Sequence, residues 1–239
     1  MDQLWLAFVQ WLHTVGLHVD AGTSRAVAES AARATQQLDM PALLALAAAL
    51  GWASGFRLYA VVFIVGLMGA ADWLALPAGL SMLAHPAVLA VSGFMLLVEF
   101  FADKVPWLDS AWDALHAFIR VPAGVALAAG VFSADNATMA VVAGLLGGSL
   151  SATALATKMT TRAAANTSPE PFSNWGLSFL EDGLVVAAVW LATQHPVLFG
   201  IALVLVLVLS VLLLVVLFKF LRAVLRRISS LFSGSAKVA

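Results

Sequence analysis

The sequence predicts an all-α integral membrane protein with about six transmembrane helices. Of its 239 residues, 62% are hydrophobic and only 10% are charged, whereas soluble domains are about 25% charged. Several apolar runs approach or exceed the roughly 20 residues that span a bilayer as a helix. The runs are continuous instead of alternating, which favours helices over a transmembrane barrel. The chain contains no cysteine, which excludes disulfides, thiolate catalysis and cysteine metal sites.

We expect one transmembrane domain over residues 41–222, preceded by interfacial and cytoplasmic helices in 1–40 and followed by a basic cytoplasmic tail in 223–239. The predicted spans are residues 41–69, 84–102, 118–133, 137–158, 175–194 and 197–221. In the N-terminal region, 3–19 is predicted to be an interfacial helix, with a short span as the alternative, and 22–38 a surface helix. The segment between Lys104 and Arg120 is predicted to be an amphipathic helix at the cytoplasmic interface.

The distribution of basic residues predicts the orientation. With both termini in the cytoplasm, eleven of the twelve Lys and Arg residues fall on the cytoplasmic side, as the positive-inside rule requires. The connections on the opposite side, at about 70–83, 134–136 and 195–196, contain none. Arg57 is the exception.

An even number of spans divides the chain into halves of opposite topology, over residues 41–133 and 137–221, and inverted repeats of this kind recur in transporters. The first span of each half carries a pair of glycines four residues apart, and the second carries acidic residues: Gly51 and Gly55 with Glu99 and Asp103, then Gly144 and Gly148 with Glu181 and Asp182. The alternative is that the glycines only pack helices and that the acidic residues lie near helix ends by chance.

Arg57 lies in a stretch, residues 40–69, that carries no other charge. A guanidinium stays protonated, and placing one in hydrocarbon costs from about 3 to more than 10 kcal/mol. A carboxylate, water or a bound anion must therefore compensate it. As one helix the first span would be roughly 43 Å long, so we expect a break at Gly51, Ser54 and Gly55. The alternative is a continuous, tilted helix with Arg57 extended to the interface.

The acidic residues are the other candidates for a buried site. Glu99 is predicted beyond the middle of the membrane, where a carboxyl must be protonated or paired. Asp103 is near enough to the interface to be an ordinary boundary charge. Glu181 and Asp182, two turns inside the fifth span, are candidate partners for Arg57, Lys158 or a cation, although no acidic residue falls plainly at the depth of Arg57.

The fourth span carries hydroxyl side chains at intervals of four, which form one polar stripe: Ser149, Thr153, Thr157 and Thr161. The stripe either lines a wet path or packs against a neighbouring helix. Lys158 is predicted at the cytoplasmic end of this span, where it attracts an anion or anchors the helix.

A resemblance supports these assignments. The string Glu99-Phe100-Phe101-Ala102-Asp103-Lys104-Val105-Pro106, with Gly55-Phe56-Arg57-Leu58-Tyr59 and the Glu181-Asp182 pair, resembles a bacterial multi-pass membrane family known as domain of unknown function 4126. The likeness covers roughly residues 41–195. It implies a bacterial inner membrane location and carries no activity, substrate or fold.

Motifs of common enzymes are absent from the sequence, so no enzymatic activity, cofactor, metal or nucleic acid is expected. The leading hypothesis is a homo-oligomeric transporter or translocase for a small anionic or zwitterionic solute or a lipid headgroup, coupled to protons or another cation. Its pathway would use the residues named above: Arg57, Glu99, Asp103, Ser149, Thr153, Thr157, Lys158, Glu181 and Asp182. The alternative is a membrane scaffold or assembly factor whose charges pair with one another, and an intramembrane enzyme is third.

Overall fold

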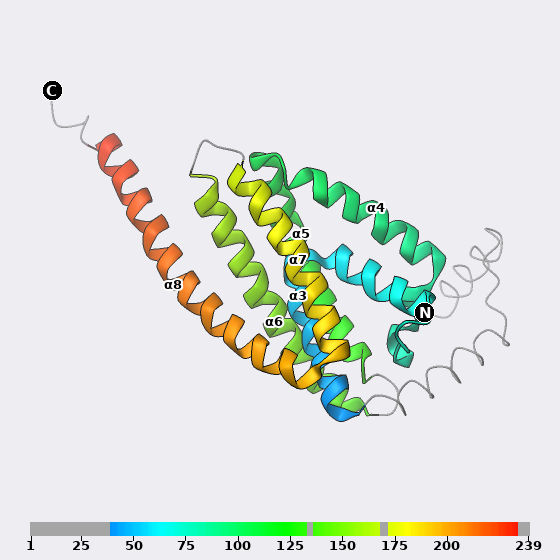
Figure 1. Cartoon of the computed structure of the whole chain (residues 1–239). Coiled ribbons are helices and arrows are strands. Elements are labelled where there is room, and N and C mark those ends of the chain that lie inside the picture. Colours follow the sequence, from blue (N-terminus) through cyan, green and yellow to red (C-terminus); the bar gives the residue numbers. More distant parts are fainter. Residues whose placement is uncertain (1–38, 133–135, 168–171, 234–239) are drawn as a thin grey trace, which may run out of the picture.

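In the computed structural model, which describes residues 39–132, 136–167 and 172–233, the fold is a bundle of helices (Figure 1). No strand occurs among these residues. The elements are α3 (Met40–Ala70), η1 (Ala78–Ala84), α4 (Pro86–Ala102), α5 (Pro106–Gly130), α6 (Ala137–Ala165), α7 (Phe172–Gln194) and α8 (Pro196–Ser233). The all-α prediction is confirmed for this part of the chain. The helices predicted at 3–19 and 22–38, and the last residues of the tail, lie outside it.

Within the described residues, four helices are long and apolar enough to cross a membrane: α3, α6, α7 and the Pro196–Ala223 part of α8. Counted together, η1 and α4 give a fifth candidate, bent by 68°. The separate third span predicted at 118–133 is wrong. That segment and the predicted interfacial helix form one continuous helix, α5, and the charged residues of its first half face the protein interior instead of water.

Side chains cap the starts of three helices. Asp39 accepts a hydrogen bond from the Ala42 backbone N–H at 3.1 Å and begins α3. His85 begins α4 and Asn136 begins α6 in the same way. Each cap satisfies a backbone donor that the first helical turn leaves free. Proline in the first turn of α3 and of α4 costs nothing, because those N–H groups have no partner inside the helix.

Small residues allow α3, α5 and α6 to cross closely. A Cβ on Gly51 would meet Gly147 Cα at 2.4 Å, and a Cβ on Gly147 would meet Ala128 Cβ at 2.3 Å and Gly124 O at 2.8 Å. The glycine pair predicted on the fourth span, Gly144 and Gly148, faces Val125 of α5 instead. The closest crossing therefore uses Gly147, one residue before Gly148.

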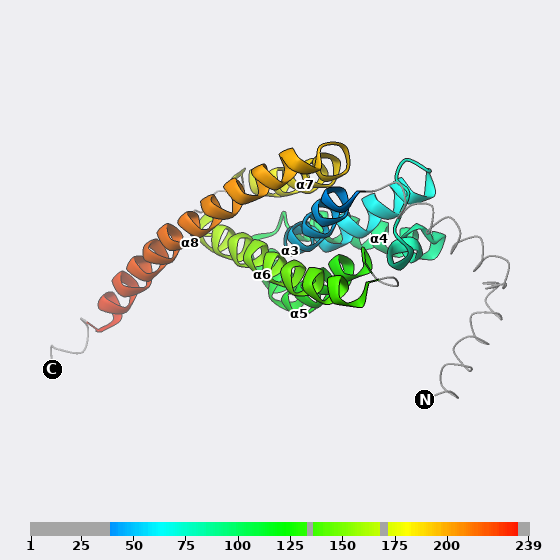
Figure 2. The same cartoon turned by 90° about the horizontal axis from the view of Figure 1, so that it is seen from below.

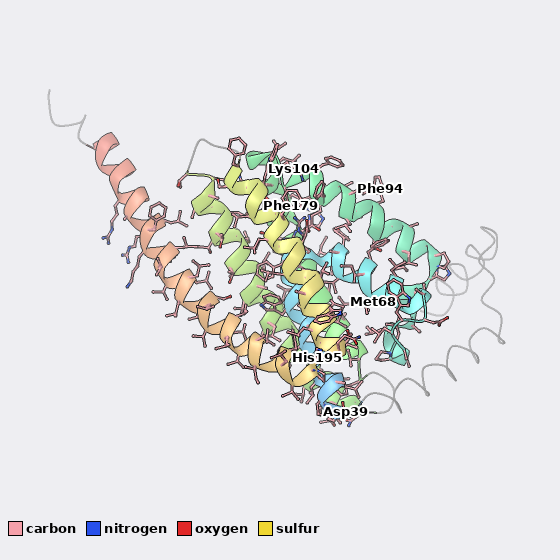
Figure 3. The ribbon with its side chains drawn as sticks, in the orientation of Figure 1. Asp39, Met68, Phe94, Lys104, Phe179 and His195 are labelled. Carbon is pink, nitrogen blue, oxygen red and sulfur yellow. The ribbon has the colours of Figure 1, made fainter. Side chains whose placement is uncertain are left out.

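The first part of α3 runs parallel to α6. Gly51 meets Gly147, and further along Gly55 meets Ser151, so both helices advance in one direction. Asp39 accordingly lies at the same end of the bundle as His195, opposite Lys104 (Figure 3). The inverted repeat requires the first spans of the two halves to run antiparallel. The antiparallel prediction is wrong for this part of α3. The sequence also placed residue 40 and the connections at 134–136 and 195–196 on opposite sides of the membrane, and this prediction is wrong too.

The direction of α3 changes near its middle, and its second part runs back beside α4 (Figures 1 and 2). Gly93 of α4 lies against the ring of Phe63, and Gly66 lies against the Leu83 carbonyl. By contrast, α8 extends away from the bundle (Figures 1 and 2), and only 6% of its most apolar window is buried. Such a surface suits contact with lipid.

Candidate functional site: a buried charge network

The bend in α3 is centred on Arg57, whose backbone is non-helical (φ −144°, ψ 78°). The predicted break therefore exists, but it lies two residues after Gly55 and not within Gly51–Gly55. The glycines are used for close packing on α6 instead. A break interrupts the helical hydrogen bonds and frees carbonyls. The Phe56 carbonyl accepts a hydrogen bond from Lys158 Nζ at 3.1 Å, so a side chain of α6 supports the bend.

Carboxylates surround the Arg57 side chain, which is 0% exposed. Its Nη2 lies 2.7 Å from Asp103 Oδ2, and its Nε lies 3.0 Å from Asp182 Oδ1 and 3.7 Å from Glu181 Oε2. Nη2 also donates to Ser178 Oγ at 2.7 Å. The bend of α3 brings Arg57 to the depth of these residues, which counting along a straight helix could not predict.

Arg57 belongs to a larger set of side chains, which we call the charge network. Its members come from α3, α4, α5, α6 and α7 and from the residue that follows α4. The members are the bases Arg57, Arg120, Lys158 and Arg162 and the acids Glu99, Asp103, Asp109, Asp113, Glu181 and Asp182. Five helices are thus joined by ion pairs at one place.

Arg120 and Lys158 bind acids of α4, α5 and α7. Arg120 lies 2.5 Å from Glu99 Oε1 and 2.7 Å from Asp113 Oδ1. Lys158 Nζ lies 3.2 Å from Asp113 Oδ1 and 3.3 Å from Glu181 Oε2. Lys158 was predicted at the mouth of the fourth span, yet its side chain is 0% exposed. It binds acids from three helices.

Arg162 joins the ends of α4 and α5 to α7. Its Nη2 lies 2.8 Å from Glu181 Oε2 and 3.2 Å from Asp103 Oδ2, and its Nη1 lies 3.1 Å from Asp109 Oδ1. Asp103 is 0% exposed, so it is not the boundary charge that the sequence suggested. Like Glu181, it pairs with both Arg57 and Arg162.

Acids outnumber bases in the charge network. If all ten groups are ionised, six carboxylates against four cations leave an excess of two negative charges. Buried charge without compensation is strongly unfavourable. Four carboxylate oxygens are buried and lack a hydrogen-bond partner among the described residues: Glu99 Oε2, Asp103 Oδ1, Asp109 Oδ2 and Asp113 Oδ2. Three buried guanidinium nitrogens of the network also lack a hydrogen-bond partner among these residues, namely Arg57 Nε, Arg57 Nη1 and Arg120 Nε, so capacity for further positive charge follows from the excess of acids and not from the unpartnered oxygens alone.

The pKa values of Asp103 and Asp109 shift in opposite directions. Burial raises the pKa of Asp109 to about 7, with Asp113 acting in the same direction and Arg162 opposing. For Asp103, burial alone also raises the pKa, but Lys158 and the surrounding arginines together bring it below its usual value. The difference follows from the number of cations that each carboxylate contacts.

Two hollows reach the charge network from outside. A groove of about 310 Å³ between α3, α4 and α7 is lined by apolar side chains and by Asp182, whose side chain is 31% exposed. A cleft of about 180 Å³ between α6, α7 and α8 is lined by Lys158, Glu181 and the buried Ser210, with apolar residues around them. Asp182 is the most exposed acid among the ion pairs of the network.

A family model, "Domain of unknown function (DUF4126)", matches residues 44–216. The chain belongs to the DUF4126 family. The resemblance seen in the sequence is thereby confirmed, and the matched region contains every member of the charge network. No curated protein and no solved structure matches the chain.

In this DUF4126 member, the hydroxyl stripe of α6 is not part of the charge network. Each hydroxyl donates to the carbonyl four residues earlier in its own helix, at 2.7–2.9 Å; the donors are Ser149, Thr153, Thr157 and Thr161. Hydroxyls satisfied in this way have no donor left for a passing solute. Thr157 and Thr161 border the α6–α7–α8 cleft, whereas Ser149 is exposed.

Four members of the charge network were not among the predicted site residues: Asp109, Asp113, Arg120 and Arg162. A signal for three of them was present in the sequence. Asp109, Asp113 and Arg120 are spaced by four and seven residues, which places them on one face of a helix. That face is buried: Asp109 is 0% and Arg120 is 1% exposed. Arg162 lies four residues after Lys158, so the sequence also placed it on the same helix face as a predicted site residue.

Proposed function

We propose that the protein is a membrane transporter for a small anionic or zwitterionic solute, lipid headgroups included, coupled to the uptake of a proton or another cation. The observation that carries this proposal is an acid-rich charge network at the bend of α3. Ionisable residues inside membrane helices commonly mark paths of ions and substrates. Interrupted helices commonly form the binding sites of transporters.

The contacts of Arg57 suggest how coupling would work. In this structure its guanidinium is bound by Asp103, Asp182 and Ser178, so an anionic solute reaches it only when a carboxylate releases it. Asp182 is the partner best placed for release, because its side chain is partly exposed to the α3–α4–α7 groove. Neutralising Asp182 would weaken its hold on Arg57. Cation uptake and anion binding would then favour each other.

The orientation in the membrane is part of the same proposal. Lys104 lies at the end of the bundle opposite Asp39 and His195 (Figure 3). The exposed bases of α8 follow its most apolar stretch: Lys219, Arg222 and Arg226. By the positive-inside rule, we place the Lys104 end in the cytoplasm of a bacterial cell with the bundle in the inner membrane, as a homo-oligomer.

The second candidate function is a membrane scaffold or assembly factor. It is favoured by the burial of Arg57, which is 0% exposed and contacts three carboxylates. In this case the ion pairs would only fix five helices in place. The two functions differ in whether the charge network changes its partners while the protein works.

Solute-dependent proton movement tests the proposal. Purified protein would be reconstituted in vesicles that contain a pH-sensitive dye and challenged with inorganic phosphate, glutamate or glycine. We expect at least one solute to change the internal pH in wild-type vesicles, and we expect Arg57→Gln and Asp182→Asn to abolish this change. Asp72→Asn is the matched control, since Asp72 is exposed and outside the network. A folded wild-type protein that moves protons with none of the three solutes would favour the scaffold.

A further inference from the structure

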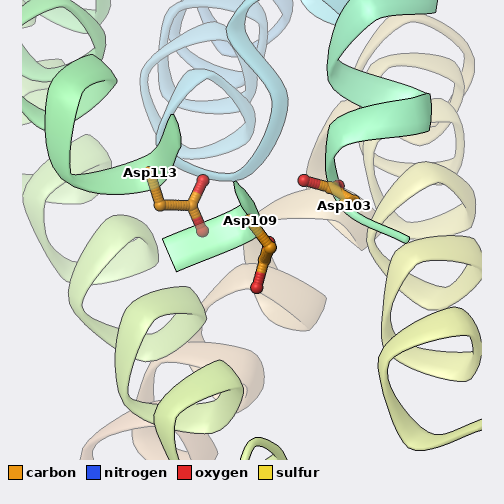
Figure 4. A group of neighbouring side chains, drawn as sticks. All are labelled: Asp103, Asp109 and Asp113. Atoms are coloured by element: carbon orange, nitrogen blue, oxygen red, sulfur yellow. The ribbon is translucent and has the colours of Figure 1, made fainter. Parts of the chain in front are cut away.

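Three aspartates of the charge network converge beside the start of α5. Asp103 follows α4, and Asp109 and Asp113 lie one turn apart near the start of α5 (Figure 4). One carboxylate oxygen of each lies within 4.8 Å of the others. The three residues are 0%, 0% and 2% exposed. We call this group the aspartate cluster.

Each aspartate of the cluster uses one oxygen for the protein's own cations and leaves the other free. Asp103 Oδ2 faces Arg57 and Arg162, and Asp109 Oδ1 faces Arg162. Asp113 Oδ1 is approached by two further bases, Arg120 and Lys158. The second oxygen of every one is buried and has no partner among the described residues: Asp103 Oδ1, Asp109 Oδ2 and Asp113 Oδ2. A buried acceptor without a donor or cation is costly, and here three occur together.

We propose that the aspartate cluster binds one Ca²⁺ ion. All three available ligands are carboxylate oxygens, which suit a hard cation and not a thiolate-loving or imidazole-loving metal. Ca²⁺ binds oxygen at about 2.3–2.6 Å, so one ion can contact oxygens up to about 5 Å apart. Mg²⁺ requires about 2.0–2.1 Å in strict octahedral geometry and fits the spacing less well. Water would complete the coordination.

The charge balance supports a divalent ion. The charge network has an excess of two negative charges when fully ionised, as counted above, and Ca²⁺ would cancel it. The proposal deepens the proposed function by naming a cation for the coupling step, and it rests on that function only for this role. Binding itself is measured without any flux.

Calcium binding to the purified full-length protein tests the site. After treatment with a chelator, the protein in detergent would be titrated with CaCl₂ by calorimetry, and its thermal unfolding would be followed with and without Ca²⁺. We expect one saturable site, a raised unfolding midpoint and weaker binding of Mg²⁺. Asp109→Asn and Asp113→Asn should each lower the affinity for Ca²⁺ by about 10-fold or more, as losing a supporting group of a metal site already does. Asp72→Asn, at an exposed residue outside the charge network, should bind as the wild type does.

A luminescence measurement covers the case in which the cluster variants do not fold. Trp112 adjoins Asp113 in the sequence and should sensitise Tb³⁺ emission from the site, which Ca²⁺ should quench by displacement. Trp112→Phe should remove most of this emission, whereas replacing the exposed Trp73 should not.

Three results would overturn the proposal: no saturable Ca²⁺ binding by the wild type, unchanged binding by folded Asp109→Asn and Asp113→Asn proteins, or stability that responds to pH but not to Ca²⁺. The last result would assign the excess charge to protons. Calcium binding without solute-dependent flux would support the calcium site and reject the transporter. Flux without calcium binding would support the transporter and reject the calcium site.

Discussion

The guanidinium of Arg57 and the carboxylate of Asp103 lie 2.7 Å apart, and neither side chain is exposed. The pair joins the bend of α3 to the end of α4. Asp103 also binds Arg162, so two guanidinium groups share this carboxylate. A residue that the sequence suggests is a boundary charge is therefore central to the packing of this bundle.

The first prediction concerns this pair. Asp103→Asn should lower the free energy of unfolding by about 3–5 kcal/mol, because removing one partner leaves buried cations uncompensated. Asp182→Asn removes the more exposed partner of Arg57 and should cost less than about 1 kcal/mol, since solvent screens an exposed pair. Denaturation of the purified protein in detergent measures both. Equal losses in the two variants would show that burial does not set the strength of these pairs.

The second prediction concerns the crossing of α3 and α6. Gly51→Ala should destabilise the protein by about 1–3 kcal/mol, because the added Cβ would meet Gly147 Cα at 2.4 Å, and this backbone cannot move without shifting a helix. Gly183→Ala is the matched control. It also lies within a helix, α7, but its Cβ would meet nothing within 4 Å, so it should be neutral or stabilise the helix by up to about 1 kcal/mol. Thermal unfolding of both variants compares them, and a similar effect at the two positions would contradict the close crossing.

The third prediction separates two classes of hydroxyl on α6. Thr153→Val should change stability by less than about 1 kcal/mol, because Thr153 donates only to its own helix. Ser151→Ala should cost about 1–3 kcal/mol. The buried Ser151 hydroxyl donates to the Arg120 carbonyl at 3.1 Å and accepts from Ser54 Oγ at 3.2 Å, so it joins α3, α5 and α6. Denaturation measures both losses of stability. A larger loss for Thr153→Val than for Ser151→Ala would show that the hydroxyl stripe makes contacts beyond its own helix.

What could be predicted from the sequence was limited to features that one helix determines alone. The apolar runs gave α3, α4 and α7 within a few residues of their bounds, and they gave the starts of α6 and α8, which extend past the predicted ends at 158 and 221. The need to compensate Arg57 pointed correctly to a buried partner. The identity of that partner could not be predicted, because it depends on a bend that places Arg57 beside α7 and the end of α4. Counting residues along a straight helix gives depth only where the helix is straight.

The burial of the first half of α5 could not be predicted for a different reason. Asp109, Asp113 and Arg120 share one face of that helix, and charged faces normally point to water. In this protein they point inward, because Lys158 and Arg162 of α6 and Glu99 of α4 are there to pair with them. Periodicity identifies a face but does not say what covers it. Only the packed bundle distinguishes a solvated charged face from a buried one.

The fourth prediction concerns the sides of the membrane. Because the first part of α3 runs parallel to α6, Asp39 and His195 should face the same compartment and Thr167, which follows α6, the opposite one. Because the chain contains no cysteine, a single introduced cysteine is the only site that a maleimide can label. The substitutions, each at an exposed residue, are Asp39→Cys, His195→Cys and Thr167→Cys. In sealed vesicles, a membrane-impermeant maleimide should label the first two from one side and the third only after the membrane is opened, or the reverse. Labelling of Asp39→Cys together with Thr167→Cys would restore the topology expected from a straight first span, and with it the antiparallel arrangement that the contact of Gly51 with Gly147 excludes.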